Sequence, residues 1–246
     1  MHIGLIIGKK LSTGIKGKNL RKILNRPSAE YAFIASKFSI IDQTFVSTDC
    51  PNIKKIGKKY HAHIIDRPKH LCRPSSLTED VLSHALINIK KKYKNIKTIS
   101  LLMANNPAIN VKLLNKAINF LKSSKKHDSC FSVVKYNMFS PNRAKKVSNG
   151  NILEFDKRLN SKKNINSIRS SQGDVYFCDL SIQVMKPSVI KNINKGQPPL
   201  KWLGKKPKAI FNDYGFDIDI EWQFKVIENW LKEKGYTNKK IPWKKK

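Results

Sequence analysis

The chain has 246 residues, of which 40% are hydrophobic, and 49 Lys and Arg residues against 17 Asp and Glu residues give it a net charge of +32. This composition excludes an intrinsically disordered chain, and the length suits one α/β domain with a sizeable core. No segment approaches the roughly 20 consecutive apolar residues that cross a bilayer, and the first residues lack the pattern of a signal peptide. We therefore expect a cytoplasmic protein without membrane contact.

The large positive charge raises RNA binding as an alternative function. Almost all of the excess is lysine, with only seven arginines, and the lysines are scattered rather than gathered on one element. We therefore expect no nucleic-acid partner and interpret the charge as a field that concentrates anionic substrates. The four cysteines are far apart and lack CxxC spacing, which indicates free thiols rather than a zinc site or disulfides.

The first predicted element is a buried strand over residues 3–7, which leads into a loop rich in glycine and lysine. Glycines let backbone N–H groups approach an anion and lysines add charge, so the loop is a candidate phosphate site, with an ordinary solvated turn as the alternative. The loop contains no GxGxxG and no Ser or Thr after a Gly-Lys pair. These absences exclude the dinucleotide fingerprint and the ATPase phosphate loop.

Strands and helices then alternate through the first 135 residues. The helix over 76–93 has apolar residues at helical spacing from Leu77 to Ile89. Such alternation predicts a Rossmann-like α/β fold, a mostly parallel twisted sheet with helices on both faces and with ligands beyond the carboxyl ends of its strands. Strands are expected at 43–47, 61–65, 96–103 and 128–134, and helices from Pro27 and at 51–60, 76–93 and 110–121.

The second half of the chain breaks this alternation. Residues 140–171 are polar and basic, which indicates a hairpin or a flap. We therefore predict a single domain over 1–246 with an inserted flap or dimerisation segment over 137–172 and a flexible basic tail over 239–246. A strand at 174–178, a loop at 195–208 and a last helix at 221–234 complete the expected elements.

Two acidic residues, Asp217 and Asp219, stand just before the last expected helix. In an extended segment residues i and i+2 point the same way, so both carboxylates would share one face. Magnesium typically uses one or two carboxylates together with substrate phosphates, so this pair is a candidate Mg²⁺ site. The alternative is that the pair caps the N-terminus of the helix.

Seven short motifs follow one another along the chain: IIGKKLSTGIKGKN at 6–19, VSTD at 46–49, RP at 67–68, LMANNP at 102–107, DSCFSV at 128–133, QGDVY at 172–176 and DIDIE at 217–221. In the same order, they resemble the motifs IPARGGSKGIPGKN, VSTD, RP, LQPTSP, DSVxSV, NGxxY and DIDxE of the acylneuraminate cytidylyltransferase family, which makes CMP-activated sialic acids. The resemblance spans nearly the whole chain and implies a fold of the nucleotide-diphospho-sugar transferase type.

The resemblance also implies an activity and a site. A hydroxyl of a nonulosonic-type sugar acid would attack the α-phosphate of CTP, with Mg²⁺ as cofactor and pyrophosphate as leaving group, for surface-glycan synthesis. Members of the family are commonly dimers, so a homodimer is expected. The implied catalytic residues are Lys9, Lys18 and, in the flap, Lys162 and Lys163; the implied nucleotide contacts are Gly8, Lys9, Lys10, Ser12, Gly14, Lys18, Asn19, Arg67, Ser76, Thr78 and Met103; and the implied metal ligands are Asp217 and Asp219.

Five positions depart from the motifs of the family. Lys9 replaces an arginine, so the bidentate hydrogen bonding of a guanidinium to phosphate is lost. Thr13 replaces a lysine, which removes a positive charge. Lys10 and Leu11 replace glycines, and Met103 replaces a glutamine. These departures leave open a catalytically impaired pseudoenzyme, or a nucleotide-binding partner subunit of the same fold.

Overall fold

The computed structural model describes residues 1–11, 14–160 and 165–243, and its centre is a seven-stranded sheet in the order β11-β7-β10-β6-β1-β4-β5. Strand β10 runs antiparallel to its neighbours β6 and β7, and the other neighbouring strands are parallel. The predicted mostly parallel sheet is confirmed. Its strands are β1 (His2–Ile7), β4 (Gln43–Thr48), β5 (His63–Asp66), β6 (Thr98–Met103), β7 (Ser129–Lys135), β10 (Tyr176–Met185) and β11 (Pro207–Phe211).

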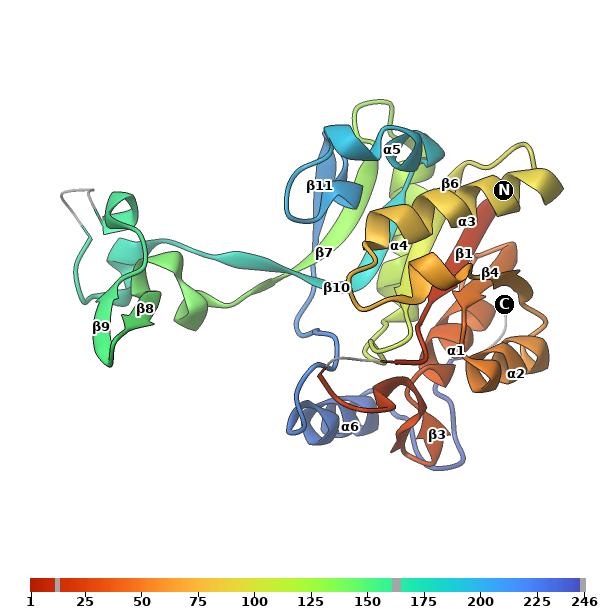
Figure 1. Cartoon of the computed structure of the whole chain (residues 1–246), viewed down its shortest axis with the longest axis horizontal. Helices are drawn as coiled ribbons and strands as arrows, with labels where there is room; N and C mark the ends of the chain where they lie inside the picture. Colours follow the sequence, from red (N-terminus) through yellow and green to blue (C-terminus); the bar gives the residue numbers. More distant parts are fainter. Residues whose placement is uncertain (12–13, 161–164, 244–246) are drawn as a thin grey trace.

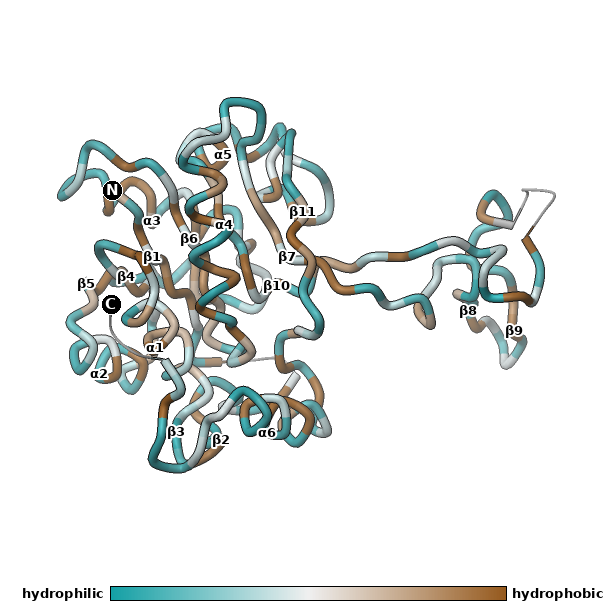
Figure 2. The backbone as a smooth tube through the Cα atoms, turned by 180° about the vertical axis from the view of Figure 1, so that it is seen from behind, coloured by the Kyte–Doolittle hydropathy of each residue, from teal (hydrophilic) through white to brown (hydrophobic). Residues whose placement is uncertain are grey.

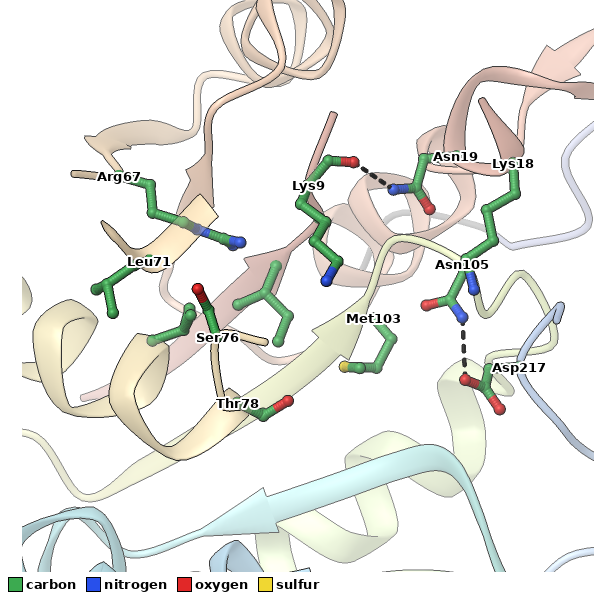
Figure 3. Close-up of a pocket in the computed structure, with 13 residues that line it drawn as sticks. Lys9, Lys18, Asn19, Arg67, Leu71, Ser76, Thr78, Met103, Asn105 and Asp217 are labelled. Carbon is green, nitrogen blue, oxygen red and sulfur yellow. Dashed lines mark hydrogen bonds between the residues drawn. The ribbon is translucent and has the colours of Figure 1, made fainter. Parts of the chain in front are cut away.

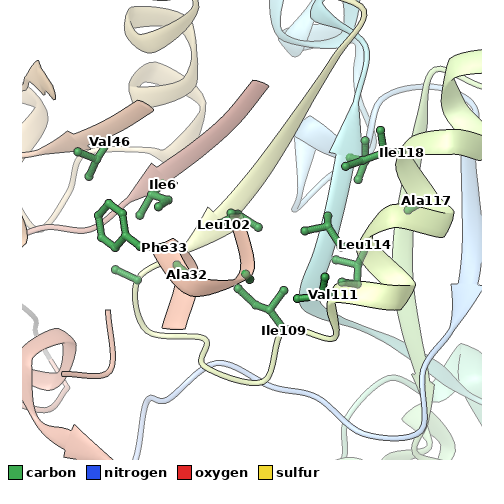
Figure 4. Close-up of a cluster of buried hydrophobic side chains, with 14 of the residues drawn as sticks. Ile6, Ala32, Phe33, Val46, Leu102, Ile109, Val111, Leu114, Ala117 and Ile118 are labelled. Carbon is green, nitrogen blue, oxygen red and sulfur yellow. The ribbon is translucent and has the colours of Figure 1, made fainter. Parts of the chain in front are cut away.

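Helices cover both faces of the sheet (Figure 1). Successive side chains of a strand point to opposite faces, and β1 illustrates this, because Ile6 belongs to one buried cluster while Leu5 and Ile7 belong to another. The cluster around Ile6 packs against α1 (Glu30–Phe38), α2 (Pro51–Lys59) and α4 (Val111–Ser123), and part of it is drawn in Figure 4. The cluster around Leu5 packs against α3 (Thr78–Lys92) and α5 (Pro187–Lys191).

Helix α4 shows how the sequence specifies a local element. The side chain of Asn110 caps its N-terminus by accepting a hydrogen bond from the backbone N–H of Leu113 at 3.2 Å. Its buried residues then recur every three or four positions, which places them in one stripe against the sheet. These residues are Val111, Leu114, Ala117, Ile118 and Leu121.

A third buried cluster lies beside the sheet, where α6 (Gln223–Glu233) packs near the short hairpin of β2 (Lys22–Ile23) and β3 (Arg26–Pro27). Ile218 is fully buried in this cluster. Trp243, within the segment expected as a tail, donates from Nε1 to the hydroxyl of Tyr236 at 2.6 Å. The described part of that segment therefore packs against the body as far as Trp243.

Some element boundaries differ from the prediction. Pro27 pairs with Lys22 in the β2–β3 hairpin, so α1 begins later, at Glu30. Leu77, expected on the buried face of α3, is instead its exposed N-cap residue. Strand β10 continues to Met185, and β11 occupies the end of the expected loop at 195–208. Only Ile210 of β11 is buried, because β11 is an edge strand, so its sequence carries almost no strand pattern.

An extended arm leaves the body between β7 and β10 (Figure 1). It begins at Tyr136, whose backbone N–H donates to the carbonyl of Val175, and it carries a small hairpin of β8 (Lys145–Ser148) and β9 (Asn151–Glu154). Apolar positions appear along the arm as well as in the central sheet (Figure 2). Hereafter "the arm" means residues 136–175.

The structure also bears on the cysteines and on membrane-spanning segments. All four cysteines are free. None of the helices in the described residues combines the length and apolar character needed to span a bilayer.

Candidate functional site

A pocket of about 230 Å³ lies beyond the carboxyl ends of β1 and β6, where ligands of parallel α/β sheets bind (Figure 3). Nine of its lining residues are among those the sequence singled out. The full lining is Ile7, Gly8, Lys9, Lys18, Asn19, Arg67, Leu71, Ser76, Thr78, Val81, Met103, Asn105 and Asp217.

The glycine loop starts at a point of close packing. A Cβ atom on Gly8 would lie 2.6 Å from the Cβ of Ala104 and 3.1 Å from Cδ1 of Ile53, so only glycine fits between the ends of β1 and β6. The loop returns at Asn19, which donates from Nδ2 to the carbonyl of Lys9 at 3.1 Å. The Oδ1 atom of Asn19 is buried and has no hydrogen-bond partner. Buried acceptors are normally satisfied, so this atom is a candidate contact for a donor on a ligand.

The acidic segment meets the glycine loop at Lys18. The Nζ atom of Lys18 lies 2.5 Å from Oδ1 of Asp219 and 2.8 Å from the carbonyl oxygen of Ile218. Asp217 lines the pocket and accepts a hydrogen bond of 2.9 Å from Nδ2 of Asn105. Burial raises the pKa of Asp217, and the charge of Asp219 adds to this effect, whereas Asn105 and Lys18 oppose it. A cation near Asp217 would relieve this cost of ionisation.

The alternative role of the acidic pair as a helix cap does not match the structure. The N-cap residue of α6 is Trp222, which makes no side-chain cap hydrogen bond. The side chain of Gln223 instead accepts from the backbone N–H groups of Asp219 and Ile220, at 2.6 and 2.8 Å. The Asp219 carboxylate therefore does not cap the helix and instead pairs with Lys18.

The opposite wall of the pocket is formed by Arg67, Ser76 and Thr78 (Figure 3). Nη2 of Arg67 donates to the carbonyl of Ser47 at 2.6 Å, which fixes the guanidinium against the end of β4. Burial lowers the pKa of Arg67, and the nearby Asp49 carboxylate opposes this, yet a guanidinium remains charged. Met103, at the end of β6, gives the pocket an apolar part.

Several predicted site residues lie elsewhere. Lys10 donates its backbone N–H to Oδ1 of Asp49 at 2.8 Å and does not line the pocket. A Cβ atom on Gly14 would lie 3.0 Å from the carbonyl oxygen of Asp219, so Gly14 lies against the acidic segment rather than in the pocket. Ser12, Lys162 and Lys163 fall outside the described residues.

The sequence-based site omitted Asn105, Ile7, Leu71 and Val81. Asn105 had a usable signal, because a polar residue directly after a buried parallel strand lies at the ligand-binding edge of the sheet. Ile7, Leu71 and Val81 had none, since apolar residues that line a pocket look the same in sequence as those of a core.

Oxygen atoms at this site fit a small divalent cation. The carboxylates of Asp217 and Asp219 are hard ligands of the kind that Mg²⁺ takes, one or two from the protein with the rest from substrate phosphates and water. Among the described residues no group of three or more His, Cys, Asp and Glu side chains forms an all-protein metal site. The donor set therefore suits a metal that arrives with a nucleotide.

A mostly parallel α/β sheet, a basic glycine loop after its first strand and an acidic pair beside that loop together form the arrangement expected of a nucleotidyltransferase. A family model described as cytidylyltransferase matches residues 3–193, and the chain belongs to this cytidylyltransferase family. The resemblance read from the sequence motifs is confirmed at this level.

Two curated proteins are similar to this chain at low identity. It is 26% identical over 233 residues to the post-translational flagellin modification protein B of Campylobacter coli, covering 93% of this chain and 94% of that protein. It is 24% identical over 162 residues to a Helicobacter pylori protein named pseudaminic acid cytidylyltransferase and UDP-2,4-diacetamido-2,4,6-trideoxy-beta-L-altropyranose hydrolase. That match covers 65% of this chain and 31% of the longer protein.

The fold is shared with a CMP:2-keto-3-deoxy-manno-octonic acid synthetase whose structure was solved with CTP. The TM-score is 0.66 at 12% identity, and the match covers 95% of this chain and 99% of the synthetase.

Proposed function

We propose that the protein is a Mg²⁺-dependent cytidylyltransferase that transfers CMP from CTP to a nonulosonic-type sugar acid and releases pyrophosphate. The main support for this proposal is that the glycine loop contacts the acidic segment through the ion pair of Lys18 and Asp219. A nucleotidyl transfer requires positive groups for the triphosphate and acidic groups for a metal at one place, because catalysis rests on positioning and on charge neutralisation.

The triphosphate is assigned to the glycine loop. Lys9 and Lys18 line the pocket from two ends of that loop, so two positively charged side chains border the space where an anion would bind. Both are point charges that adapt to phosphate oxygens without the fixed geometry of a guanidinium. Their role is to bind the phosphates and to offset the negative charge that builds up on the leaving pyrophosphate.

The cytosine base is assigned to the region of Asn19, Arg67 and Met103. The unpartnered Oδ1 of Asn19 would accept a hydrogen bond from the exocyclic amine of cytosine. Met103 would pack on the base without a hydrogen bond, and the hydroxyls of Ser76 and Thr78 would contact the ribose.

The metal is assigned to Asp217 and Asp219. Bound Mg²⁺ would supply charge neutralisation and orientation of the phosphates. The protein contributes a half-buried carboxylate, Asp217, held in orientation by the Asn105 amide, and an exposed one, Asp219. Lys18 stabilises Asp219 by direct contact, so the same lysine links the phosphate and metal regions.

The sugar acid and the pathway are suggested by the relatives. The names of these two curated relatives refer to flagellin modification and to pseudaminic acid, which supports a nonulosonic acid as acceptor and surface-glycan synthesis as purpose. Because CTP is a cytoplasmic nucleotide, we propose the cytoplasm as the place of reaction.

A homodimer formed through the arm is part of the same proposal. Val147 and Ile152 face each other across the β8–β9 hairpin and are each 74% exposed. Large exposed apolar patches on soluble proteins mark contact surfaces, and a second copy of this chain offers the same patch in return. Other exposed apolar residues of the arm are Met138, Phe139, Leu153, Phe155 and Ile168.

The decisive experiment measures pyrophosphate release from CTP, and from ATP, GTP and UTP, with a panel of nonulosonic and related sugar acids and with Mg²⁺. Turnover with CTP and one sugar acid, lost on chelation of the metal, supports the proposal. Asp219→Asn should abolish turnover while leaving the melting temperature almost unchanged, because Asp219 is exposed and caps no helix.

Calorimetry with CTP separates the remaining alternatives. Binding of CTP without turnover under all conditions would identify a pseudoenzyme or a nucleotide-binding subunit. Tight RNA binding that weakens about 10³-fold or more between low and moderate salt, without CTP binding, would favour the nucleic-acid alternative.

A further inference from the structure

A buried carboxylate outside the pocket, that of Asp179 in β10, has no role in the site described above. Asp179 is 4% exposed. Its Oδ1 atom accepts hydrogen bonds from the hydroxyls of Ser132 and Ser181 and from the backbone N–H of Ser181, and its Oδ2 atom accepts from the amide of Asn212. A buried carboxylate is costly unless fully hydrogen-bonded, and these partners satisfy it with neutral donors.

The backbone around Asp179 is shaped to bring the carboxylate to this position. Cys178 pairs with Val133 and Gln183 pairs with Phe131, so residues 179–182 of β10 lie opposite the single residue Ser132 of β7. Within this bulge Leu180 has a φ of 58°, in the left-handed region that non-glycine residues seldom adopt. Bulges of this kind redirect a side chain that a regular strand would place differently.

From this bulge the Asp179 carboxylate holds the first part of the segment that leads to the acidic pair. Nδ2 of Asn212 lies 2.7 Å from Oδ2 of Asp179 and also donates to the carbonyl of Tyr214 at 2.9 Å. Gly215 passes so close that a Cβ atom there would lie 2.7 Å from Oδ2 of Asp179. The hydroxyl of Tyr136, at the root of the arm, donates to the carbonyl of Gly215 at 3.3 Å.

The last part of the segment is held by the loop after β6. The backbone N–H of Ile218 donates to the carbonyl of Asn105 at 2.8 Å, and the side chain of Asn105 donates to Asp217. The next residue of the same loop, Asn106, donates from Nδ2 to the backbone carbonyl of Asp179 at 3.2 Å. Asp179 therefore contacts both ends of the segment 212–219: its carboxylate bonds to Asn212, and its backbone carbonyl bonds to the loop after β6 that holds Asp217 and Ile218.

We propose that Asp179 is a positioning residue for the acidic pair. Its hydrogen bond with Asn212 and its close packing against Gly215 fix the path of residues 212–219, and this path directs Asp217 and Asp219 toward the bound metal and nucleotide. This inference rests on the proposed function, and it adds a residue that touches neither nucleotide nor metal. The root of the arm is also anchored to this segment, because the hydroxyl of Tyr136 donates to the carbonyl of Gly215.

The test is the substitution Asp179→Asn in the full chain. The asparagine side chain keeps the shape and the acceptor for Ser132 and Ser181, but its amide group faces the donating amide of Asn212, so the contact to the segment is lost. We expect the Mg²⁺ concentration for half-maximal pyrophosphate release to rise by about tenfold or more, since a hydrogen bond to a charged group is lost. At saturating Mg²⁺ the KM for CTP should stay within about twofold, because no nucleotide contact changes.

A second readout does not depend on turnover. Hydrogen exchange followed by mass spectrometry should show faster exchange over 212–219 in Asp179→Asn, by about the same factor, and Mn²⁺ titration of the CTP-bound protein should show weaker metal binding. Asn212→Ala removes the same contact from the other side, together with the bonds from Asn212 to Ser181 and Tyr214. It leaves the hydrogen bonds from Ser132 and Ser181 to Asp179 in place. It should reproduce all three changes.

The matched control is Asp128→Asn. Asp128, near the opposite end of β7, likewise holds a loop, through hydrogen bonds of 2.8 and 3.0 Å from the backbone N–H groups of Lys205 and Lys206. The Asp128→Asn substitution should lower the melting temperature without changing the Mg²⁺ dependence or the hydrogen exchange of residues 212–219.

Two results would overturn the inference: unchanged exchange over 212–219 in both Asp179→Asn and Asn212→Ala, or an unchanged metal dependence with only a lower melting temperature. If the unaltered protein releases no pyrophosphate with any substrate, the proposed function fails, whereas the exchange experiment still decides the role of Asp179.

Discussion

Lys18 and Asp219 lie 201 positions apart in the sequence, and their side chains form an ion pair with 2.5 Å between Nζ and Oδ1. The ammonium group is largely buried, with 13% of the Lys18 side chain exposed, whereas the carboxylate is 62% exposed. The pair alone adds little stability, about 0–1 kcal/mol, because solvent around the exposed carboxylate screens it. Its importance is geometric, since it joins the glycine loop to the acidic segment.

Replacement of Lys18 by methionine should cause a large loss of activity. Its ammonium group would be missing both from the triphosphate and from Asp219, so kcat should fall about 10²-fold or more, as for other electrostatic groups aimed at developing charge. Steady-state kinetics checks this. Lys16→Met is the matched control, because Lys16 is an exposed lysine of the same loop outside the pocket. Equal losses in both variants would refute a specific role for Lys18.

Gly8→Ala should destabilise the fold at the edge of the pocket. The new methyl group would lie 2.6 Å from the Cβ of Ala104, and overpacking of this kind typically costs about 1–3 kcal/mol. Chemical denaturation measures the loss. The double variant Gly8→Ala/Ala104→Gly recreates the space and should recover most of the stability. Absence of recovery would mean that backbone conformation, rather than this contact, requires glycine.

Acid should weaken the fold through His84 in α3. Burial lowers the pKa of His84 and the charge of Arg67 adds to this effect, while Nδ1 is buried without a partner. Because the folded pKa lies below the unfolded value of about 6.5, the unfolded state binds the proton first, and stability present above pH 6.5 is lost as pH falls.

Denaturation midpoints measured between pH 7.5 and 5 provide the check on His84. His84→Gln should flatten the pH dependence, because it removes the imidazole whose pKa burial lowers. An identical pH dependence in His84→Gln and in the unaltered protein would contradict the assignment.

The arm should determine the oligomeric state. Val147→Lys combined with Ile152→Lys places two charges on the exposed face of the β8–β9 hairpin, and we expect a homodimer to become monomeric in sedimentation equilibrium. Ile87→Lys, at a residue 61% exposed on α3, controls for the added charge and should remain dimeric. A monomer before any substitution would rule out the proposed dimer.

The sequence alone predicted the alternation of strands and helices over the first 135 residues, because most of these strands are buried on both faces and the helices keep one apolar stripe. The run at Ile3–Ile7 and the recurrence from Val81 to Ile89 illustrate both patterns. It also selected Gly8, Lys9 and Asp217, since glycine, charge and position after a strand are local signals, whereas Asn19 was implied only by the resemblance to the family. The edge strand β11 escaped because a strand with one buried residue resembles a loop.

Tertiary structure alone decided which of the selected residues meet. Nothing local in the sequence indicates that Asp219 lies against Lys18, that Asn105 orients Asp217, or that Lys10 does not line the pocket, because this depends on how the sheet and its loops pack. The same holds for Asp179, because its partner Ser132 lies in β7 and its partner Asn212 follows the end of β11. Hydrophobic periodicity acts within one element and can be read there, whereas a polar site requires groups from distant segments, and only the folded chain brings them within hydrogen-bonding distance.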